Sequence, residues 1–225
     1  MSNKIWFFGD SFTKGDGCIP NNDSPYYDEY PYNRDKIWTS IVSEHFKMEE
    51  MNMGESGASN SWILNTILDN LYLIGKGDFV VISDTRPTRF IIPRVHDGEI
   101  SNFSPGQEGV WDYHIKHRKD AIKPTEWEDM KKTLINFTWY FQEEYFQLWE
   151  EYYNKRFQNL LKFFEKNNIR SIFWSYKLWY EKQLKLELII EDNPEIKNEH
   201  WSWKGHRDFA NWLIDNNKDT FKNLI

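Results

Sequence analysis

The chain has 225 residues, a length that suits one large α/β domain with a core of its own. It carries 28 basic and 35 acidic residues, a net charge of −7, so we expect neither a nucleic-acid nor a membrane partner, because both require a basic face. The single cysteine, Cys18, excludes an internal disulfide framework and a Cys-rich zinc site. Aromatic residues make up 18 % of the chain, enough to supply a core despite a polar average.

Export and membrane signals are not evident in the sequence. No stretch approaches the roughly 20 apolar residues that span a bilayer. The apolar run at 5–8 is too short for the hydrophobic region of a signal peptide. We therefore expect a cytoplasmic protein, and association with a virion stays open.

Short apolar runs alternate along the chain with segments of helical periodicity. In chain order, the pattern predicts a strand at 4–8, a loop at 13–35, a helix at 37–46, a poorer strand at 48–53, a helix at 60–74, a strand at 78–83, a long helix at 134–166, a strand at 170–176 and a helix at 203–213. The long helix is expected to be kinked or split, and 184–190 is ambiguous between helix and strand. Residues 84–130 are irregular and rich in proline, which is typical of a functional loop or lid.

Strands that alternate with helices indicate right-handed crossovers and a parallel sheet covered on both faces. We predict a single α/β domain over 1–225, with a loop-rich insertion at about 84–130. In such folds the active site lies where the strands end and the loops begin.

The first of these loops begins Gly9-Asp10-Ser11, directly after a predicted strand. Glycine permits a tight turn there, and a helical turn after Ser11 would direct backbone N–H groups at a developing oxyanion. This arrangement favours Ser11 as a nucleophile. The alternative is that Asp10 and Ser11 only cap a helix.

The second loop follows the strand at 48–53 and leads into the helix that begins near Asn60. Gly57 within it can offer an unobstructed N–H to an oxyanion. The alternative is a plain turn in which Ser59 or Asn60 is the helix cap.

The third loop precedes the last helix and contains His200. A neutral imidazole is the usual base for a serine hydroxyl, and a loop histidine can reach over the sheet edge. His206 would lie inside the helix, where a packing or capping role is expected.

Together the three loops resemble the conserved blocks of the SGNH (GDSL-type) hydrolase family, in the family's order and over nearly the whole chain. The resemblance implies a flavodoxin-like α/β/α sandwich of three layers. It also implies Ser11 as the nucleophile, His200 as the base, and an oxyanion hole formed by the N–H groups of Ser11 and Gly57. Asp10, Trp201 and Trp203 are the candidates for substrate binding, since they flank these blocks.

Two positions depart from the family pattern. The family's third block supplies an oxyanion-donating Asn after the third strand, where this chain has Ser83-Asp84-Thr85-Arg86 with no Asn; Arg86 or Arg89 could replace that donor. The family's acid precedes the histidine by two or three residues. Here Asn198, Glu199, Glu195 or a backbone carbonyl is left to orient the imidazole.

The resemblance implies a serine esterase that hydrolyses a small-acyl ester, with O-acetyl groups on carbohydrate as the commonest substrate class. No cofactor is expected, and the spacing of the acidic and histidine residues matches no metal site. Some of the tryptophans and tyrosines could stack on sugars, although packing is favoured for most. The alternative function is a binding or structural protein that kept the fold without catalysis, carbohydrate-binding or virion-associated. The oligomeric state is left open.

Overall fold

A computed structural model describes residues 3–16, 37–87, 89–93, 100–103, 132, 144–180, 186 and 201–221. Its elements are β1 (Lys4–Gly9), α1 (Ser11–Lys14), α2 (Trp38–Phe46), β2 (Glu49–Gly54), α3 (Asn60–Asn70), the 3₁₀ turn η2 (Leu71–Leu73), β3 (Phe79–Ser83), β4 (Phe90–Pro93), β5 (Ile100–Phe103), α6 (Glu144–Lys166), β6 (Arg170–Trp174), α7 (Lys177–Tyr180), α8 (Trp203–Asn216) and α9 (Lys218–Phe221).

Four strands form a parallel sheet in the order β2-β1-β3-β6. This is the strand order of the flavodoxin-like fold, in which the chain reverses its direction of winding between β1 and β3. The register pairs Gly9 with Gly54 and Ser83 with Trp174, so the carboxyl ends of all four strands meet at one edge. The predicted fold class is confirmed.

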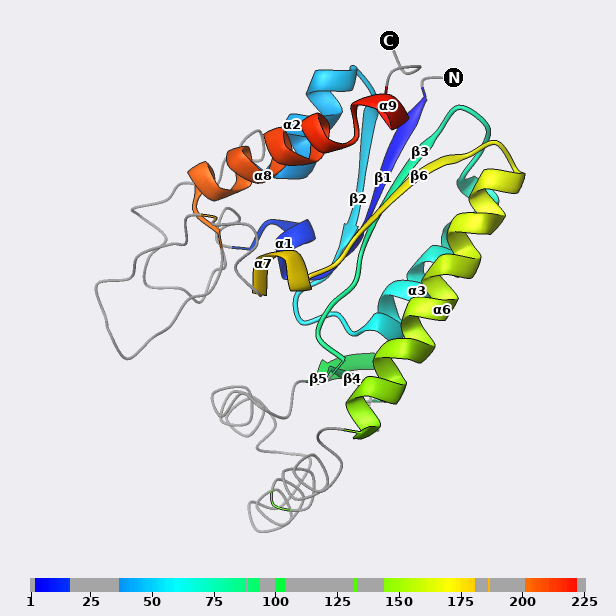
Figure 1. Ribbon diagram of the computed structural model, residues 1–225, viewed down its shortest axis with the longest axis vertical. Helices are drawn as coiled ribbons and strands as arrows, with labels where there is room; N and C mark the ends of the chain where they lie inside the picture. The colour runs from blue at the N-terminus through cyan, green and yellow to red at the C-terminus, as the bar shows by residue number, and fades with distance from the viewer. Residues whose placement is uncertain are drawn as a thin grey trace.

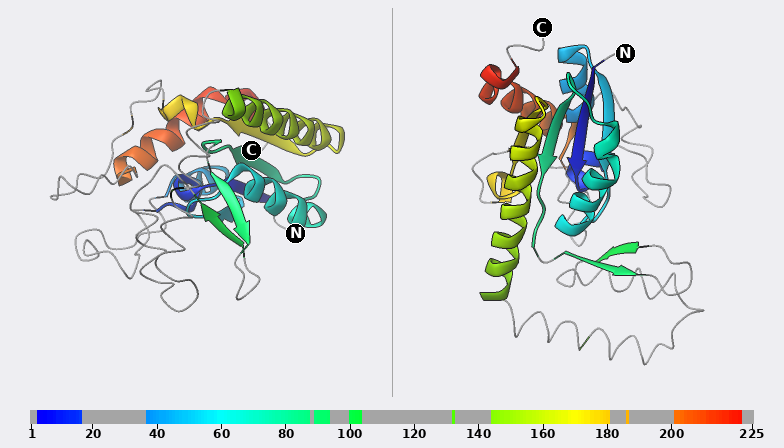
Figure 2. Two further views of the ribbon diagram at one scale, coloured as in Figure 1. Left: turned by 90° about the horizontal axis from the view of Figure 1, so that it is seen from below. Right: turned by 90° about the vertical axis from the view of Figure 1, so that its right-hand side faces the viewer.

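Helices cover both faces of the sheet, as Figures 1 and 2 show: α2 and α8 on one side, α3 and α6 on the other. Because successive side chains of a strand point to opposite faces, β1 supplies both halves of the core. Ile5 and Phe7 pack with the α2–α8 layer, and Trp6 and Phe8 with the α3–α6 layer. Burying each of these side chains stabilises the fold by about 1.5–3 kcal/mol.

Three helices begin at the carboxyl edge of the sheet with a polar cap. Asp10 accepts the N–H of Phe12 at 3.1 Å, Ser59 that of Trp62 at 3.2 Å, and Ser202 that of Gly205 at 3.2 Å. Such caps satisfy N–H groups that lack a partner inside the helix, at about 1 kcal/mol each. These caps hold the starts of α1, α3 and α8 at the sheet edge where the sequence predicts the active site.

Several predicted boundaries change in the structure. The irregular segment 84–130 contains an antiparallel pair, β4 and β5, in which Phe90 is opposite Phe103. The expected break in the helix at 134–166 is not present over Glu144–Lys166, where α6 is a single helix about 34 Å long. Residues 134–143, most of 13–35 and nearly all of 184–190 lie outside the described residues.

No helix in the described part of the chain is both long and apolar enough to cross a membrane.

Candidate active site

Ser11 is the first residue of α1, at the carboxyl edge of the sheet and 5 % exposed. The strand reaches this position because Gly9 has no side chain. A Cβ on Gly9 would lie 2.1 Å from the hydroxyl oxygens of Ser83 and Thr13, which contact each other at 3.2 Å. Asp10 caps α1, as the capping interpretation predicts. The Ser11 hydroxyl takes no part in this cap and forms no hydrogen bond to any described residue.

The predicted oxyanion donors are the backbone N–H groups of Ser11 and Gly57. Gly57 has a φ of 71°, a left-handed conformation that glycine adopts without strain. Its N–H and that of Ser11 donate to no other described residue, whereas the neighbouring Ala58 N–H is bonded to the carbonyl of Glu55 at 3.0 Å. Both N–H groups are therefore available to an oxyanion.

Asp10 is the acceptor of a buried network beside Ser11. Its Oδ1 accepts the N–H of Phe12, and its Oδ2 accepts the hydroxyl of Thr85 at 3.0 Å and Nη1 of Arg89 at 2.7 Å. The side chains of Asp10 and Arg89 are 5 % and 12 % exposed. Asp10 is thus engaged within the protein, and the expectation that it binds substrate stays a prediction.

Arg89 connects the loops that follow three strands. Its Nη1 lies 2.7 Å from Asp10 after β1, 3.3 Å from the carbonyl oxygen of Ala58 after β2, and 2.7 Å from the hydroxyl of Thr85 after β3. The other guanidinium N–H groups donate to no described residue. Nη1 is occupied by these oxygens, so the predicted oxyanion contact of Arg89 would have to come from the remaining N–H groups.

Arg86, the other candidate donor, lies partly buried in the same loop, and its carbonyl accepts the N–H of Arg89 at 3.2 Å. Its predicted role at the oxyanion stays a prediction.

A contact that sequence reasoning missed joins the loop after β2 to the loop after β3. The Asn60 amide donates to the carbonyl of Thr85 and accepts its N–H, both at 2.8 Å, and both residues are buried. Asn60 had been considered only as a helix cap, a role that Ser59 fills. An amide with one donor and one acceptor matches a backbone peptide, but no sequence spacing reveals which peptide it will meet.

Asp84, at the end of β3, is a second group that sequence reasoning did not place in the site. It accepts the N–H of Tyr176 at 2.7 Å and the hydroxyl of Ser175 at 3.0 Å, which joins β3 to the turn after β6. Burial raises the pKa of Asp84 to about 7, against the opposing effect of these hydrogen bonds. Its position directly after a buried strand was the available signal.

His200, Asn198 and Glu199 lie outside the described residues, so their roles stay predictions. The residue after His200 is described. The ring of Trp201 lies 4.8 Å from the ring of Phe12, the residue after Ser11. Phe12 is fixed in turn, because its carbonyl accepts Nε1 of Trp38 at 2.8 Å. The two sequence segments that carry the predicted nucleophile and base are therefore packed together.

The burial of Trp201 corrects one expectation. Its ring is 0 % exposed and packs among Trp174, His206 and Phe209, so it is a core residue and presents no face to a substrate. Trp203 is partly buried against the same cluster, and its predicted contact with substrate stays a prediction. His206 is also fully buried, with Nδ1 3.5 Å from the N–H nitrogen of Trp38, in agreement with a packing role.

Among the described residues, no group of three His, Cys, Asp or Glu side chains could hold a metal ion.

No protein-family model and no curated protein matches the chain. Solved structures do match, among them a member of the lipolytic protein G-D-S-L family from Veillonella parvula, at 15 % identity and a TM-score of 0.42, over 95 % of this chain and 97 % of that one. An acetyl xylan esterase from the rumen bacterium Butyrivibrio proteoclasticus matches at 12 % identity and a TM-score of 0.45, over 98 % of this chain and 65 % of that one.

These proteins bear the name of the family that the three sequence blocks resemble, or of an esterase. The fold of this chain is the three-layer α/β/α sandwich that its own sheet and helices define.

Proposed function

We propose that this protein is a serine esterase of the SGNH type that hydrolyses a small-acyl ester, with O-acetyl groups on carbohydrate as the substrate class. One observation carries the proposal: the Ser11 hydroxyl and two unbonded backbone N–H groups belong to neighbouring loops at the carboxyl edge of a parallel sheet. A serine nucleophile requires such donors beside it, because the tetrahedral intermediate carries a negative oxygen.

In the proposed reaction the Ser11 hydroxyl oxygen attacks the ester carbonyl while His200 takes the hydroxyl proton. The N–H groups of Ser11 and Gly57 stabilise the oxyanion, an effect worth about 10²–10³ in kcat for one donor. His200 then gives its proton to the leaving alcohol. Water, deprotonated by the same histidine, then attacks the acyl carbonyl, and the histidine returns that proton to the Ser11 oxygen as the carboxylic acid leaves.

The ion pair of Asp10 with Arg89 supports this chemistry electrostatically. A bare carboxylate next to the nucleophile would oppose the negative charge that develops on the substrate oxygen, most strongly where water is excluded. Arg89 Nη1, 2.7 Å from Asp10 Oδ2, cancels that charge. The three loops therefore meet at a site with no net negative charge from Asp10.

The segment around His200 completes the proposed site. Trp201 is anchored on Phe12, and His200 is covalently joined to Trp201, so the histidine belongs to a segment that begins beside the nucleophile. We propose that Asn198 or Glu199 orients its imidazole.

The proposal is tested with p-nitrophenyl acetate and a fluorophosphonate probe. We expect the wild type to release p-nitrophenol and to be labelled at Ser11, and Ser11→Ala to lose both. Ser56→Ala is the matched control, since Ser56 is exposed in the turn next to Gly57, and it should retain both. A folded wild type that neither hydrolyses the ester nor reacts with the probe would instead support the non-catalytic binding protein.

A further inference from the structure

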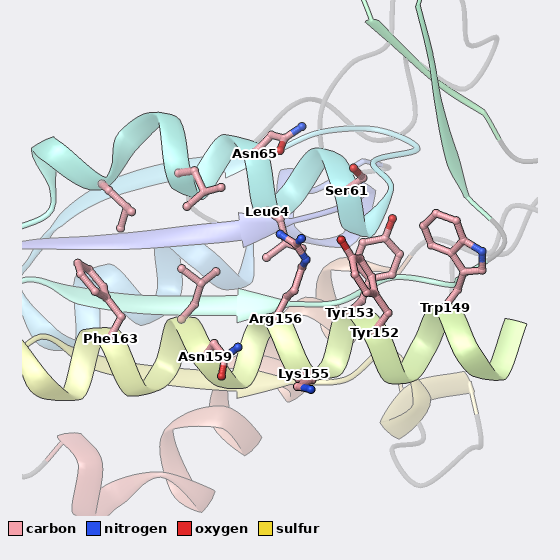
Figure 3. Close-up of a pocket in the computed structure, with 13 residues that line it drawn as sticks. Ser61, Leu64, Asn65, Trp149, Tyr152, Tyr153, Lys155, Arg156, Asn159 and Phe163 are labelled. Carbon is pink, nitrogen blue, oxygen red and sulfur yellow. The ribbon is translucent and has the colours of Figure 1, made fainter.

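A groove between α3 and α6 lies outside the proposed catalytic residues. It has a volume of about 730 Å³, which is within the usual range of about 300–1,000 Å³ for ligand sites. In Figure 3, the side chains of Trp149, Tyr152, Tyr153, Arg156 and Phe163 project from α6 toward α3, with Trp149 at one end and Phe163 at the other. The groove is partly open to solvent.

Aromatic rings gather at one end of this groove. Trp149 lies 5.4 Å from Tyr153 and 6.0 Å from Tyr152, and the Tyr152 side chain remains exposed. Planar amides stand beside the rings: Asn65 on α3 and Asn159 on α6 are exposed, and their side chains bond to no described residue. Rings combined with amides match the apolar faces and hydroxyl groups of a sugar.

The groove is also positively charged, on a chain whose net charge is −7. Lys155 and Arg156 line it, and neither forms an ion pair with a described residue. Arg156 instead lies over the ring of Tyr152, 4.7 Å from its centroid. None of the described residues that line the groove is acidic, so no carboxylate among them would repel a bound anion.

The aromatic end of the groove is next to the proposed active site. Ser61 lines it and directly follows Asn60, whose amide holds Thr85. Glu150, adjacent to Trp149, forms an ion pair with Lys177 in α7, the helix after β6. Both contacts place this end at the carboxyl edge of the sheet, where Ser11 lies.

We propose that this groove binds an anionic carbohydrate chain, one that carries carboxylate groups, and that the chain is the alcohol part of the ester substrate. The second half of the proposal rests on the proposed esterase function; the first half does not. Sugar rings would pack on Trp149 and Tyr152, and a carboxylate would pair with Arg156 or Lys155.

A carbohydrate fits these observations better than a lipid or a peptide. An acyl chain requires an enclosed apolar channel, whereas this groove is open and has amides on both walls. A peptide needs backbone partners from a sheet edge or a continuous apolar groove, and cations interrupt this one. Anionic vesicles and an acidic peptide therefore serve as alternative ligands in the test.

The direct test is calorimetric binding to the folded Ser11→Ala chain, which cannot consume an ester. We expect an oligogalacturonide to bind and a neutral xylo-oligosaccharide to bind at least about tenfold more weakly, with an affinity for the acid that falls as salt is added. Arg156→Gln and Tyr152→Ala should each lower the affinity for the acidic ligand by about tenfold or more. Lys166→Gln is the matched control, because Lys166 is exposed on the same helix outside the groove, and it should change affinity less than about twofold.

Equal affinity for acidic and neutral sugars, unaffected by Arg156→Gln, would overturn the anionic specificity. Binding of phosphatidylglycerol vesicles or an acidic peptide, with no binding of oligogalacturonide, would overturn the carbohydrate assignment.

Kinetics separate this inference from the proposed function. Arg156→Gln should lower kcat/KM for an acetylated oligogalacturonide by a larger factor than kcat/KM for p-nitrophenyl acetate, and Lys166→Gln, outside the groove, should change neither value. If the wild type hydrolyses neither ester but binds the acidic sugar, the esterase proposal fails and the binding site stands. If it hydrolyses both esters and binds no sugar in the groove, only the further inference fails.

Discussion

Arg89 Nη1 and Asp10 Oδ2 lie 2.7 Å apart, buried at the point where the loops after β1, β2 and β3 meet. The two residues are 79 positions apart in the sequence. The pair places a guanidinium beside the predicted nucleophile and holds the Gly57–Ala58 turn, through the Ala58 carbonyl, against the loop that carries Ser11.

Removal of one member of this ion pair should destabilise the fold. Arg89→Met leaves the Asp10 carboxylate buried without its cation, and we expect the free energy of unfolding to fall by about 3–5 kcal/mol, measured by urea denaturation. The double variant Asp10→Asn with Arg89→Met should recover part of this loss, because no buried charge remains unpaired. A loss below about 1 kcal/mol in the single variant would contradict a buried, structural pair.

The conformation of Gly57 gives a second expectation. Its φ of 71° costs an alanine about 1–2 kcal/mol, so Gly57→Ala should shift the turn and move its N–H away from the oxyanion. We expect kcat to fall by tenfold or more with little change in KM, since the contact exists only in the transition state. Gly57→Asn should lower kcat less than Gly57→Ala does, because asparagine tolerates this conformation. Equal kcat values for all three proteins would exclude Gly57 as a donor.

Asp84 predicts a pH dependence of stability. Its pKa is about 7 in the folded protein and 3.8 in a model compound, so between these values the folded state binds the proton more tightly than the unfolded state. The free energy of unfolding should therefore fall as the pH rises from about 4 through 7, by an amount on the order of 4 kcal/mol. Asp84→Asn should flatten this dependence in denaturation curves measured across that range. An unchanged slope in the variant would contradict a raised pKa.

Phe12 tests whether the packing of Trp201 positions the catalytic segment. Phe12→Ala removes the ring that contacts Trp201 4.8 Å away, and we expect kcat for p-nitrophenyl acetate to fall by about tenfold or more. Phe12→Leu keeps an apolar side chain there and should retain most of the activity. If both variants keep full kcat while stability falls, the contact is structural only.

Apolar patterns made the layers of this fold predictable. Within the predicted strands, 5–8 and 79–82 are apolar at every position because the strands are buried on both faces, and the periodicity of 60–74 is that of a helix with one face on the sheet. The β4–β5 pair was not foreseen, since antiparallel pairing inside a proline-rich segment leaves no strong periodicity.

The site was predictable in part, for a different reason. Ser11 and Gly57 lie two and three residues after the ends of β1 and β2, so local sequence marks their position at the sheet edge. The partners of Asp10, Thr85 and Asn60 depend on contacts between distant loops, which no single segment encodes. Trp201 misled because an aromatic residue beside a catalytic loop can face either a pocket or the core, and here it is fully buried.

The most direct measurement of the proposed mechanism is detection of the acyl-enzyme. The protein is incubated with p-nitrophenyl acetate, quenched in acid and digested, and the peptide that carries Ser11 is examined by mass spectrometry. We expect an acetyl group on Ser11 in the wild type and its loss in His200→Ala, because the hydroxyl then lacks its base. Turnover of the ester with no acetyl group on Ser11, or acetylation of Ser11 that is equally fast in His200→Ala, would contradict the assignment of Ser11 and His200 as nucleophile and base.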